Sequence, residues 1–417
     1  MAKRRKAVIA ALAVTGVIAV AGIAACAPQA NTAGTPEAQI MPQEDEYGVV
    51  VAQEWEGLYP DQVATYRMND ENAPGDAKHD YLQLYPELNT MYKGYAFALD
   101  YDEAASHTYS LESVSNTLRT IEKEQLANCI TCKTPQFTAL VNSEGDEVYT
   151  QKFNDTIGQF TEPISCYNCH ENDPEGTVRV TGQYFVRSLG DDIENAPAEA
   201  EVCGQCHNEY YFDPETKVTT NPYTGLAAMS PVQILKYYDD LGYSDWTHPD
   251  TGAGLIKAQH PEFETLYGGI TQPHMVELGY ACSDCHMGEQ TREDGTDYTS
   301  HYWRSPLENQ ELIDSTCSTC HDDLAGEIAE IQAASEERVN AIAAKIETYI
   351  NELAAARNAG TLSGDALAQA QQLHREAQFY WDFVMVENSE GAHNPDLANY
   401  TLDLAEAAVD EGLALIG

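Results

Sequence analysis

Basic residues are scarce in this sequence. Its 417 residues include 22 Lys and Arg against 67 Asp and Glu, so the formal net charge at pH 7 is −45. Such a chain repels phosphate backbones, which excludes nucleic acid as a natural partner. Four of the basic residues lie in "MAKRRK" at the start, so the remainder of the chain is even more acidic.

Long apolar runs are absent after the first 25 residues, and no later segment is apolar enough to span a bilayer. The start has a basic hexapeptide, an apolar run rich in small residues, and then Cys26. This order is similar to a bacterial lipoprotein signal, so we expect residues 1–25 to be removed and Cys26 to carry lipid. An uncleaved membrane anchor is the alternative. Either one exports the chain to the extracytoplasmic face of the cell membrane (periplasm or cell surface), with residues 26–45 as a flexible acidic tether.

No cysteine lies outside a C-x-x-C pair once Cys26 is set aside. Disulfide frameworks use irregular spacings, and zinc ribbons do not require His as the next residue. Four pairs read "CYNCH", "CGQCH", "CSDCH" and "CSTCH", which is the signature of covalent c-type haem attachment, and the fifth reads "CITCK". The sequence predicts five covalently bound c-type haems, attached at Cys129 and Cys132, Cys166 and Cys169, Cys203 and Cys206, Cys282 and Cys285, and Cys317 and Cys320.

The residue after each pair is predicted to bind the haem iron. These residues are Lys133, His170, His207, His286 and His321. Electron-transfer haems take a second protein ligand, and the other eight histidines can supply four of them. The haem at Lys133 then keeps an open position where a substrate can bind. Because a free Lys amine is protonated at pH 7, burial beside the iron must remove that proton.

No long alternating run predicts a sheet. From 46 to about 325 the motifs fall in short helical stretches separated by turns. Beyond them, 326–360 has apolar residues at three- and four-residue steps, from Ile328 and Ile331 to Leu353, which predicts a long amphipathic helix. Further long helices are expected over 364–387 and 396–416. The predicted fold is mainly α: a multihaem cytochrome c domain (46–325) with little sheet, followed by a C-terminal helical region (326–417).

One CxxCK followed by four CxxCH motifs resembles the pentahaem, ammonia-forming cytochrome c nitrite reductase (NrfA) family, and the resemblance spans about 79–400. "SNTLRT" (115–120), "CGQCHNEYYF" (203–212) and "KAQHPEFE" (257–264) match the family as well. The resemblance implies six-electron reduction of nitrite to ammonium at the Lys133-ligated haem, fed by four bis-His haems. It implies a catalytic pocket of Arg119, Tyr210 and His260. A guanidinium can hold the oxygens of nitrite, and an imidazole can deliver protons.

The resemblance also implies a calcium ion, held by Glu209 and Gln259 through side-chain oxygens and by Tyr210 and Lys257 through carbonyls. A salt bridge between Glu209 and Lys257 is the alternative. As distal iron ligands it implies His301 for the second haem, His107 for the third, His393 for the fourth and His274 for the fifth. We expect His374 to be structural, and His79 and His248 to be exposed or hydrogen-bonded loop residues.

The family uses long C-terminal helices for dimerisation, so we expect a homodimer through 326–417, with simple packing onto the haem domain as the alternative. The expected electron donor is a membrane quinol-oxidising multihaem cytochrome or another haem protein. Two further readings stay open. One is an electron-transfer cytochrome without its own substrate, in which His79 or His248 fills the sixth position at the Lys133 haem. The other is a reductase of hydroxylamine, nitric oxide or sulfite.

Overall fold

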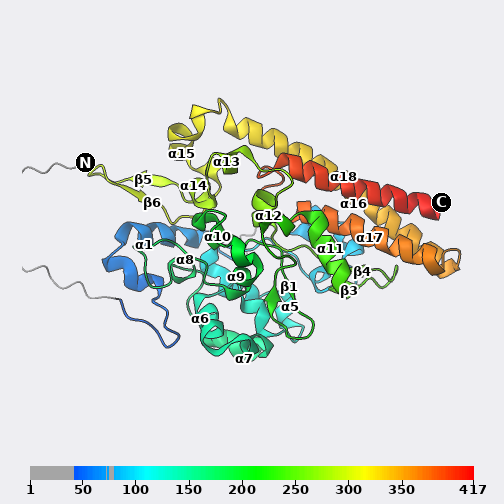
Figure 1. Cartoon of the computed structure of the whole chain (residues 1–417), viewed down its shortest axis with the longest axis horizontal. Helices are drawn as coiled ribbons and strands as arrows, with labels where there is room; N and C mark the ends of the chain where they lie inside the picture. Colours follow the sequence, from blue (N-terminus) through cyan, green and yellow to red (C-terminus); the bar gives the residue numbers. More distant parts are fainter. Residues whose placement is uncertain (1–41, 72, 75–78) are drawn as a thin grey trace, which may run out of the picture. The chain divides into compact units, whose positions relative to one another are not determined.

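Short helices and turns form most of the described chain between residues 42 and 323, and three long helices follow (Figure 1). The computed structural model describes residues 42–71, 73–74 and 79–417. The signal segment, Cys26 and the tether up to residue 41 lie outside the described residues. The α-helices are α1 Pro60–Arg67, α2 Tyr81–Leu84, α3 Leu88–Met91, α4 Ser110–Ser115, α5 Leu118–Ile121, α6 Pro135–Glu144, α7 Phe153–Thr156, α8 Tyr167–His170, α9 Gln183–Leu189, α10 Ala198–Gly204, α11 Pro231–Leu241, α12 Glu262–Tyr267, α13 His274–Glu277, α14 Cys282–His286, α15 Gln310–Ser315, α16 Leu324–Ala359, α17 Gly364–Met385 and α18 Pro395–Ile416.

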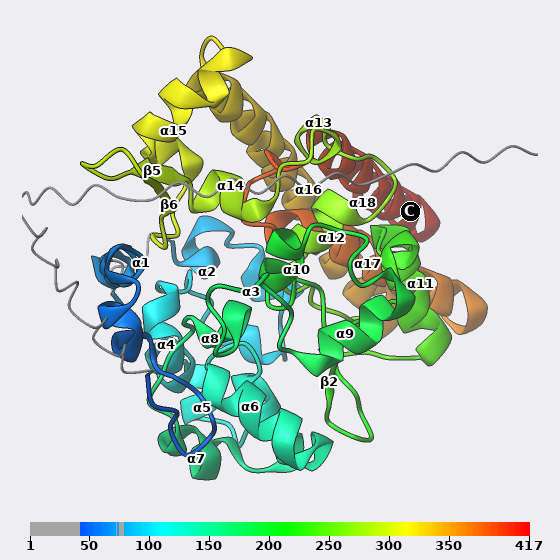
Figure 2. The same cartoon turned by 60° about the vertical axis from the view of Figure 1, so that its left-hand side comes forward.

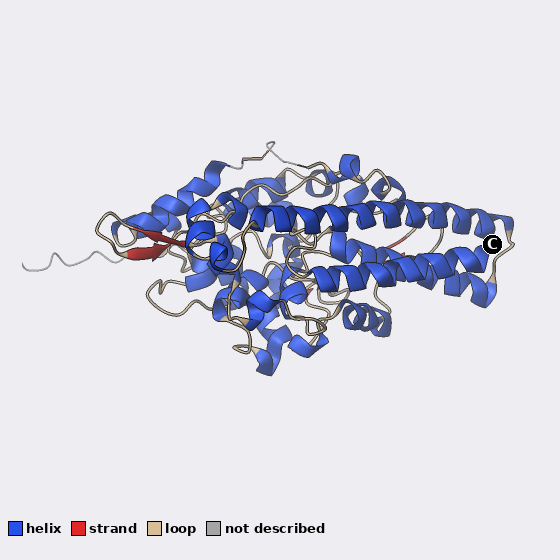
Figure 3. Ribbon diagram, turned by 90° about the horizontal axis from the view of Figure 1, so that it is seen from above, coloured by secondary structure: helices blue, strands red, loops and turns tan. Residues whose placement is uncertain are grey.

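Short 3-10 helices link many of these elements. They span Ala52–Gly57, Met68–Glu71, Ala96–Ala98, His107–Tyr109, Ala127–Ile130, Asp146–Thr150, Ile157–Gln159, Gly190–Asp192, Leu226–Ala228, Pro306–Glu308 and Cys317–Thr319. The strands in the described residues form three antiparallel pairs, which are the red ribbons of Figure 3. They are β1 Tyr211–Phe212 with β2 Thr219–Thr220, β3 Trp246–Thr247 with β4 Gly254–Leu255, and β5 Glu289–Thr291 with β6 Asp297–Thr299. The predicted mainly-α fold with little sheet is therefore confirmed.

Two of the three long helices, α16 and α18, begin at side-chain caps. The Asp323 carboxylate accepts the amide of Gly326 at 3.0 Å at the start of α16, and Gly360, with φ 70°, ends that helix in a left-handed conformation that glycine adopts without strain. Asn394 accepts the amide of Leu397 and precedes a proline at the first position of α18. The predicted long C-terminal helices are confirmed within a few residues at each end.

Packing of the long helices explains the apolar stripe of α16. Ile342, Ile346 and Leu353 are buried, as expected, whereas Ile328 and Ile331 remain half-buried because burial along the helix begins only at Val339. Tyr349 fills the junction of all three helices. Its hydroxyl donates to the carbonyl of Ala370 on α17 at 2.6 Å, and its ring lies so close to Gly412 on α18 that a Cβ there would overlap it.

The main hydrophobic core joins the helical region to the haem-motif part. Leu88, Phe185, Phe263 and Trp381 all belong to it, and none is more than 2 % exposed. Residues Pro42–Gly417 accordingly form one compact unit. Within that unit, Figures 1 and 2 both place α6 and α7 on the side away from α18, with α8 and α10, which belong to two of the haem motifs, between them. No helix among the described residues combines the length and apolar character needed to cross a membrane.

Candidate functional site

Each haem motif is one turn of helix. At the second motif, the amide of His170 donates to the carbonyl of Cys166 at 2.9 Å, and the same bond closes the motifs that begin at 203 and 317. Residues three and four apart on a helix share a face, so both thiols and the following side chain point to one side. The Lys133 motif has a tighter turn, because its amide donates to Ile130 at 3.0 Å, and Ser110 donates to the Lys133 carbonyl at 2.7 Å. All ten motif cysteines are free, as thioether bonds to haem require.

The structure brings together each predicted pair of axial histidines. An iron atom bound by two imidazoles at about 2 Å holds their ring centroids roughly 6 Å apart. The four observed separations are 6.0 Å for His107 and His207, 6.3 Å for His170 and His301, 6.3 Å for His274 and His321, and 6.0 Å for His286 and His393. His260 also lies 6.3 Å from His207, and it is the motif resemblance that assigns His107 as the partner. These spacings fit bis-His haems.

Hydrogen bonds at Nδ1 fix several of these rings and leave Nε2 for the iron. Histidines that bind a metal commonly donate their other ring nitrogen to a carbonyl or carboxylate, which fixes the tautomer and the orientation. The Nδ1 contacts are His286 to the Arg304 carbonyl at 3.0 Å, His301 to the Thr299 carbonyl at 3.1 Å, His321 to Glu327 at 2.6 Å and His393 to Glu387 at 2.6 Å.

Two buried histidines without a predicted iron, His248 and His374, have both ring nitrogens engaged. His248 contacts the Thr90 carbonyl through Nε2 at 2.9 Å and accepts the Thr251 amide at Nδ1. His374 contacts the Thr251 hydroxyl through Nδ1 at 3.2 Å and Gln378 through Nε2 at 3.1 Å. Both rings are fully buried, so neither has a nitrogen left for a metal. His248 is hydrogen-bonded, as expected, and His374 has a structural role on α17.

Burial keeps several of the paired histidines neutral, whereas contacts with carboxylates raise the pKa values of His207 and His393. Burial lowers the pKa of His107 to about 3 and the pKa values of His286 and His301 to about 4, so these rings are neutral at pH 7. A neutral imidazole is the form that binds iron. His393 differs: burial also disfavours its charged form, but the contact with Glu387 outweighs this and raises the pKa to about 9. Iron must displace a proton at that position.

Arg119 and Lys257 converge on one aromatic ring. The guanidinium carbon of Arg119, on α5, lies 4.0 Å from the ring centroid of Phe97, and the Lys257 amine lies 4.7 Å from the same centroid. Nη1 of Arg119 donates to the carbonyl of Asp100 at 2.7 Å and to its carboxylate at 3.0 Å, while the second carboxylate oxygen accepts the amide of Leu118. Asp100 thus fixes the arginine and the start of α5 together.

Tyr210 and His260 lie close enough to these cations for the charges to shift their pKa values. Burial raises the pKa of Tyr210 well above its usual value, and the charge of Arg119 opposes that shift. Burial lowers the pKa of His260 to about 4; the Glu262 carboxylate opposes this shift, and the positive charge of Lys257 adds to it. At pH 7 both side chains are therefore neutral hydrogen-bond donors beside these cations.

The segment that carries His260 is irregular, and carboxylates hold its backbone. The amides of residues 257, 258 and 259 donate to Asp245 at 2.9 Å, Asp382 at 2.9 Å and Glu209 at 2.6 Å. Asp382 and Glu209 are fully buried. Asp245 and Asp382 were not predicted from the sequence. A lone acid in the apolar run "FYWDFVM" is a signal that could have pointed to Asp382.

The predicted calcium residues lie around this segment. Glu209 also accepts the Tyr238 hydroxyl at 2.8 Å, and burial raises its pKa well above the ordinary value. The Gln259 side chain lies 3.0 Å from the Lys257 carbonyl. The Lys257 amine donates to the carbonyl of Ala258 at 2.6 Å and forms no ion pair with Glu209. The described residues contain no group of three His, Cys, Asp or Glu placed to hold a metal, so an ion here needs the carbonyl and amide oxygens.

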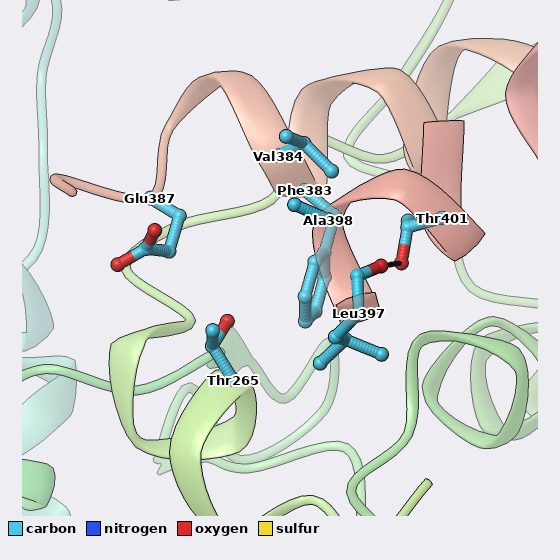
Figure 4. Close-up of a pocket in the computed structure, with 7 residues that line it drawn as sticks. All are labelled: Thr265, Phe383, Val384, Glu387, Leu397, Ala398 and Thr401. Carbon is cyan, nitrogen blue, oxygen red and sulfur yellow. Dashed lines mark hydrogen bonds between the residues drawn. The ribbon is translucent and has the colours of Figure 1, made fainter. Parts of the chain in front are cut away.

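A small cavity lies away from this pocket, between α12, α17 and α18. Its volume is about 10 Å³, room for roughly one water, and its lining is mostly apolar (Figure 4). Glu387, the partner of His393, lies at its edge, and the Thr401 hydroxyl donates to the Leu397 carbonyl at 2.7 Å. The full lining is Thr265, Phe383, Val384, Glu387, Leu397, Ala398 and Thr401. It is too small for a cofactor and is a packing feature.

Matches with known proteins cover most of the chain. The family profile described as "Cytochrome c552" matches residues 52–416. The cytochrome c nitrite reductase subunit NrfA of Nitratidesulfovibrio vulgaris is 33% identical over 396 residues, covering 82% of this chain and 74% of that protein. A cytochrome c-552 of Parabacteroides distasonis is 30% identical over 364 residues, covering 82% and 71%.

A solved structure is similar over most of the chain. It is the catalytic subunit NrfA of the cytochrome c nitrite reductase of Desulfovibrio desulfuricans, which has two calcium sites. The TM-score is 0.77 at 26% identity, covering 88% of this chain and 86% of that one. With five haem motifs in the expected order and matches of this extent, the chain belongs to the cytochrome c552 family.

Proposed function

We propose that this chain is an ammonia-forming nitrite reductase. The reaction consumes one nitrite, six electrons and eight protons and yields one ammonium and two waters. One observation carries the proposal: the single motif with Lys in place of His lies close to a pocket with two cations and two neutral donors. The cations are Arg119 and Lys257, and the donors are Tyr210 and His260. A haem held at Cys129 and Cys132 supplies, when bound, the iron to which nitrite attaches and through which electrons arrive.

The side chains of the pocket have distinct roles. Because Asp100 occupies Nη1 of Arg119, the donors on Nε and Nη2 are those that can face the nitrite oxygens. Lys257 adds a second positive charge. Tyr210 and His260 are neutral and can donate hydrogen bonds to oxygens that leave as water. Local cations prevail over the acidic exterior, because distant carboxylates are screened beyond about 8 Å at physiological salt.

Calcium is part of the proposal. Glu209 and the 257–259 segment present carboxylate, amide and carbonyl oxygens, which are the ligands that calcium prefers, and the related D. desulfuricans subunit has calcium sites. Burial raises the pKa of Glu209 well above its ordinary value, and a bound cation would favour its ionised, metal-binding form. An ion at Glu209 would also fix the Tyr210 backbone.

Electron paramagnetic resonance of the ferric protein, with and without nitrite, tests the proposal. We expect one high-spin haem that responds to nitrite among four low-spin haems. Five low-spin haems indifferent to nitrite would leave an electron-transfer cytochrome. That alternative needs a sixth ligand at the Lys133 haem, but both nitrogens of His248 are engaged, and His79 is exposed. Parallel assays with hydroxylamine, nitric oxide and sulfite rank the substrates.

The cellular setting completes the proposal. The signal segment exports the chain and Cys26 anchors it by lipid at the extracytoplasmic face of the membrane, where a quinol-oxidising multihaem cytochrome or another haem protein donates electrons. Residues 46–325 form the catalytic domain, and 326–417 supply a homodimer interface. Sedimentation of the purified protein tests the dimer, and mass spectrometry of the amino-terminal peptide tests the lipid.

A further inference from the structure

Asp382 is a buried acid without a partner cation in ion-pair contact. It lies on α17 with no exposed surface, and no ion pair links it to a Lys, Arg or His of the described residues. Burying a carboxylate is costly unless hydrogen bonds compensate it. Two such bonds are present: the Tyr92 hydroxyl donates to Oδ1, and the Ala258 amide donates to Oδ2 at 2.9 Å.

The contact with Ala258 reaches the pocket. Residues 256–260 have no regular secondary structure, so their amides find no partner in a helix or strand ladder. Ala258 is fully buried, and without Asp382 its amide would be left without an acceptor, which buried groups rarely tolerate. His260 follows two residues later. A shift of the backbone at 258 therefore moves the imidazole.

Asp382 is itself held rigidly. Trp381, the preceding residue, donates its indole N–H to the Val339 carbonyl of α16 at 2.8 Å, and Gln378, one turn earlier, donates to the Met91 carbonyl at 3.2 Å. The acceptor for Ala258 thus rests on a packed helix pair. Of the three carboxylates that hold residues 257–259, it alone comes from the C-terminal helices.

We propose that Asp382 is a positioning residue for the pocket: from α17 it accepts the Ala258 amide and thereby fixes the position of His260 in the pocket. The role rests on the proposed function, because the reaction it serves is nitrite reduction. Asp382 acts through the Ala258 amide. Its effect is on the geometry of a neighbour, and misplacement by about 1 Å can cost on the order of 100-fold in rate.

The test uses the haem-loaded, full-length protein. Asp382→Leu has a similar shape but removes the acceptor, whereas Asp382→Asn retains an oxygen that can accept the Ala258 amide and an NH₂ that can donate to Tyr92. Asp365→Leu, at an exposed position at the start of the same helix, is the matched control. We would measure haem content, kcat and KM for nitrite, and hydrogen exchange of the 255–262 peptide.

We expect Asp382→Leu to keep five haems, to lose about 10- to 100-fold in kcat with KM changed less than threefold, and to exchange faster in 255–262. Asp382→Asn and Asp365→Leu should stay within threefold of the wild type. Unchanged kcat and exchange in Asp382→Leu would overturn the role. So would an Asn variant as slow as the Leu variant, or a loss that follows haem content, since charge or general stability would then explain the effect.

Two outcomes need separate handling. If Asp382→Leu does not assemble, Tyr92→Phe takes its place, because it loosens Asp382 without removing it, and unchanged kcat and exchange there would refute the positioning role. If the wild type itself does not reduce nitrite, the proposed function fails. Hydrogen exchange of the 255–262 peptide then decides by itself whether Asp382 holds the segment. If the Leu variant exchanges as slowly as the wild type, Asp382 does not hold the segment.

Discussion

Replacement of Arg119 by Lys separates charge from hydrogen-bond geometry in the pocket. Nη1 of Arg119 makes both contacts to Asp100, at 2.7 and 3.0 Å, which leaves Nε and Nη2 for an anion. A Lys has one nitrogen, so the same ammonium must serve Asp100 and nitrite. The substitution keeps the positive charge and removes the planar, multiple-donor geometry of the guanidinium.

The expected fall in kcat/KM follows from the hydrogen bond between Arg119 and the nitrite anion that is lost. A hydrogen bond to a charged group contributes about 1.5–3 kcal/mol, which corresponds to roughly 10- to 150-fold in kcat/KM at 1.36 kcal/mol per factor of ten. We expect a fall of that size in Arg119→Lys. The thermal midpoint should change little, because the side chain is partly exposed, with 22 % of its surface accessible.

The assay is steady-state nitrite reduction with a reduced viologen dye as donor, normalised to haem. Arg187→Lys is the control, because Arg187 pairs with Asp146 at 3.4 Å on the surface, where both side chains are about half exposed. Surface pairs of this kind contribute little. An Arg119→Lys enzyme within twofold of the wild type, or an equal loss in Arg187→Lys, would refute the role given to the guanidinium.

Four other changes have expected outcomes. Lys133→His should retain five haems by absorbance but lower turnover at least tenfold, since the tight turn at this motif suits a longer side chain; wild-type turnover would contradict this. Chelation of calcium should lower the thermal midpoint and turnover, and added calcium should restore both, because an ion at 100 times its Kd stabilises by about 2.7 kcal/mol; a chelator without effect excludes the ion. Tyr349→Phe should cost about 1 kcal/mol in urea unfolding through the lost bond to Ala370, and an unchanged midpoint would show that this bond adds nothing. His374 has a folded-state pKa of about 3, below its unfolded value of about 6.5. Between these pH values the unfolded chain takes up the proton, so stability falls by about 1.4 kcal/mol per pH unit as the pH drops. Urea midpoints of His374→Gln should decline less than those of the wild type over this range, and an identical decline rules this out.

Features with local signatures were predictable from the sequence. The attachment motifs are contiguous, and the long helices have both periodicity and caps, so their bounds fell within a few residues. Ile328 and Ile331 show the limit of periodicity, because a stripe indicates which face is apolar but not how far along the helix a neighbour covers it. The pairing of His274 with His321, by contrast, came from resemblance, and the structure brings the two rings together.

Support of the site by distant residues was not predictable. Asp100 precedes Arg119 by 19 residues, and Asp382 and Ala258 are separated by 124. No spacing rule connects such positions, because the contacts arise from the packing of irregular segments against helices. Composition could only show that acids are abundant, and the few that are buried differ from the rest only in the folded chain.

The contact between α17 and Ala258 also bears on the order of assembly. Every attachment motif precedes α17 in the chain, so haem can be joined to all ten cysteines before that helix has been made. The acceptor for the Ala258 amide arrives afterwards. A chain cut before α17 is therefore expected to carry its full set of haems while the segment around His260 lacks its anchor, so maturation of the cofactors and completion of the pocket are separate steps.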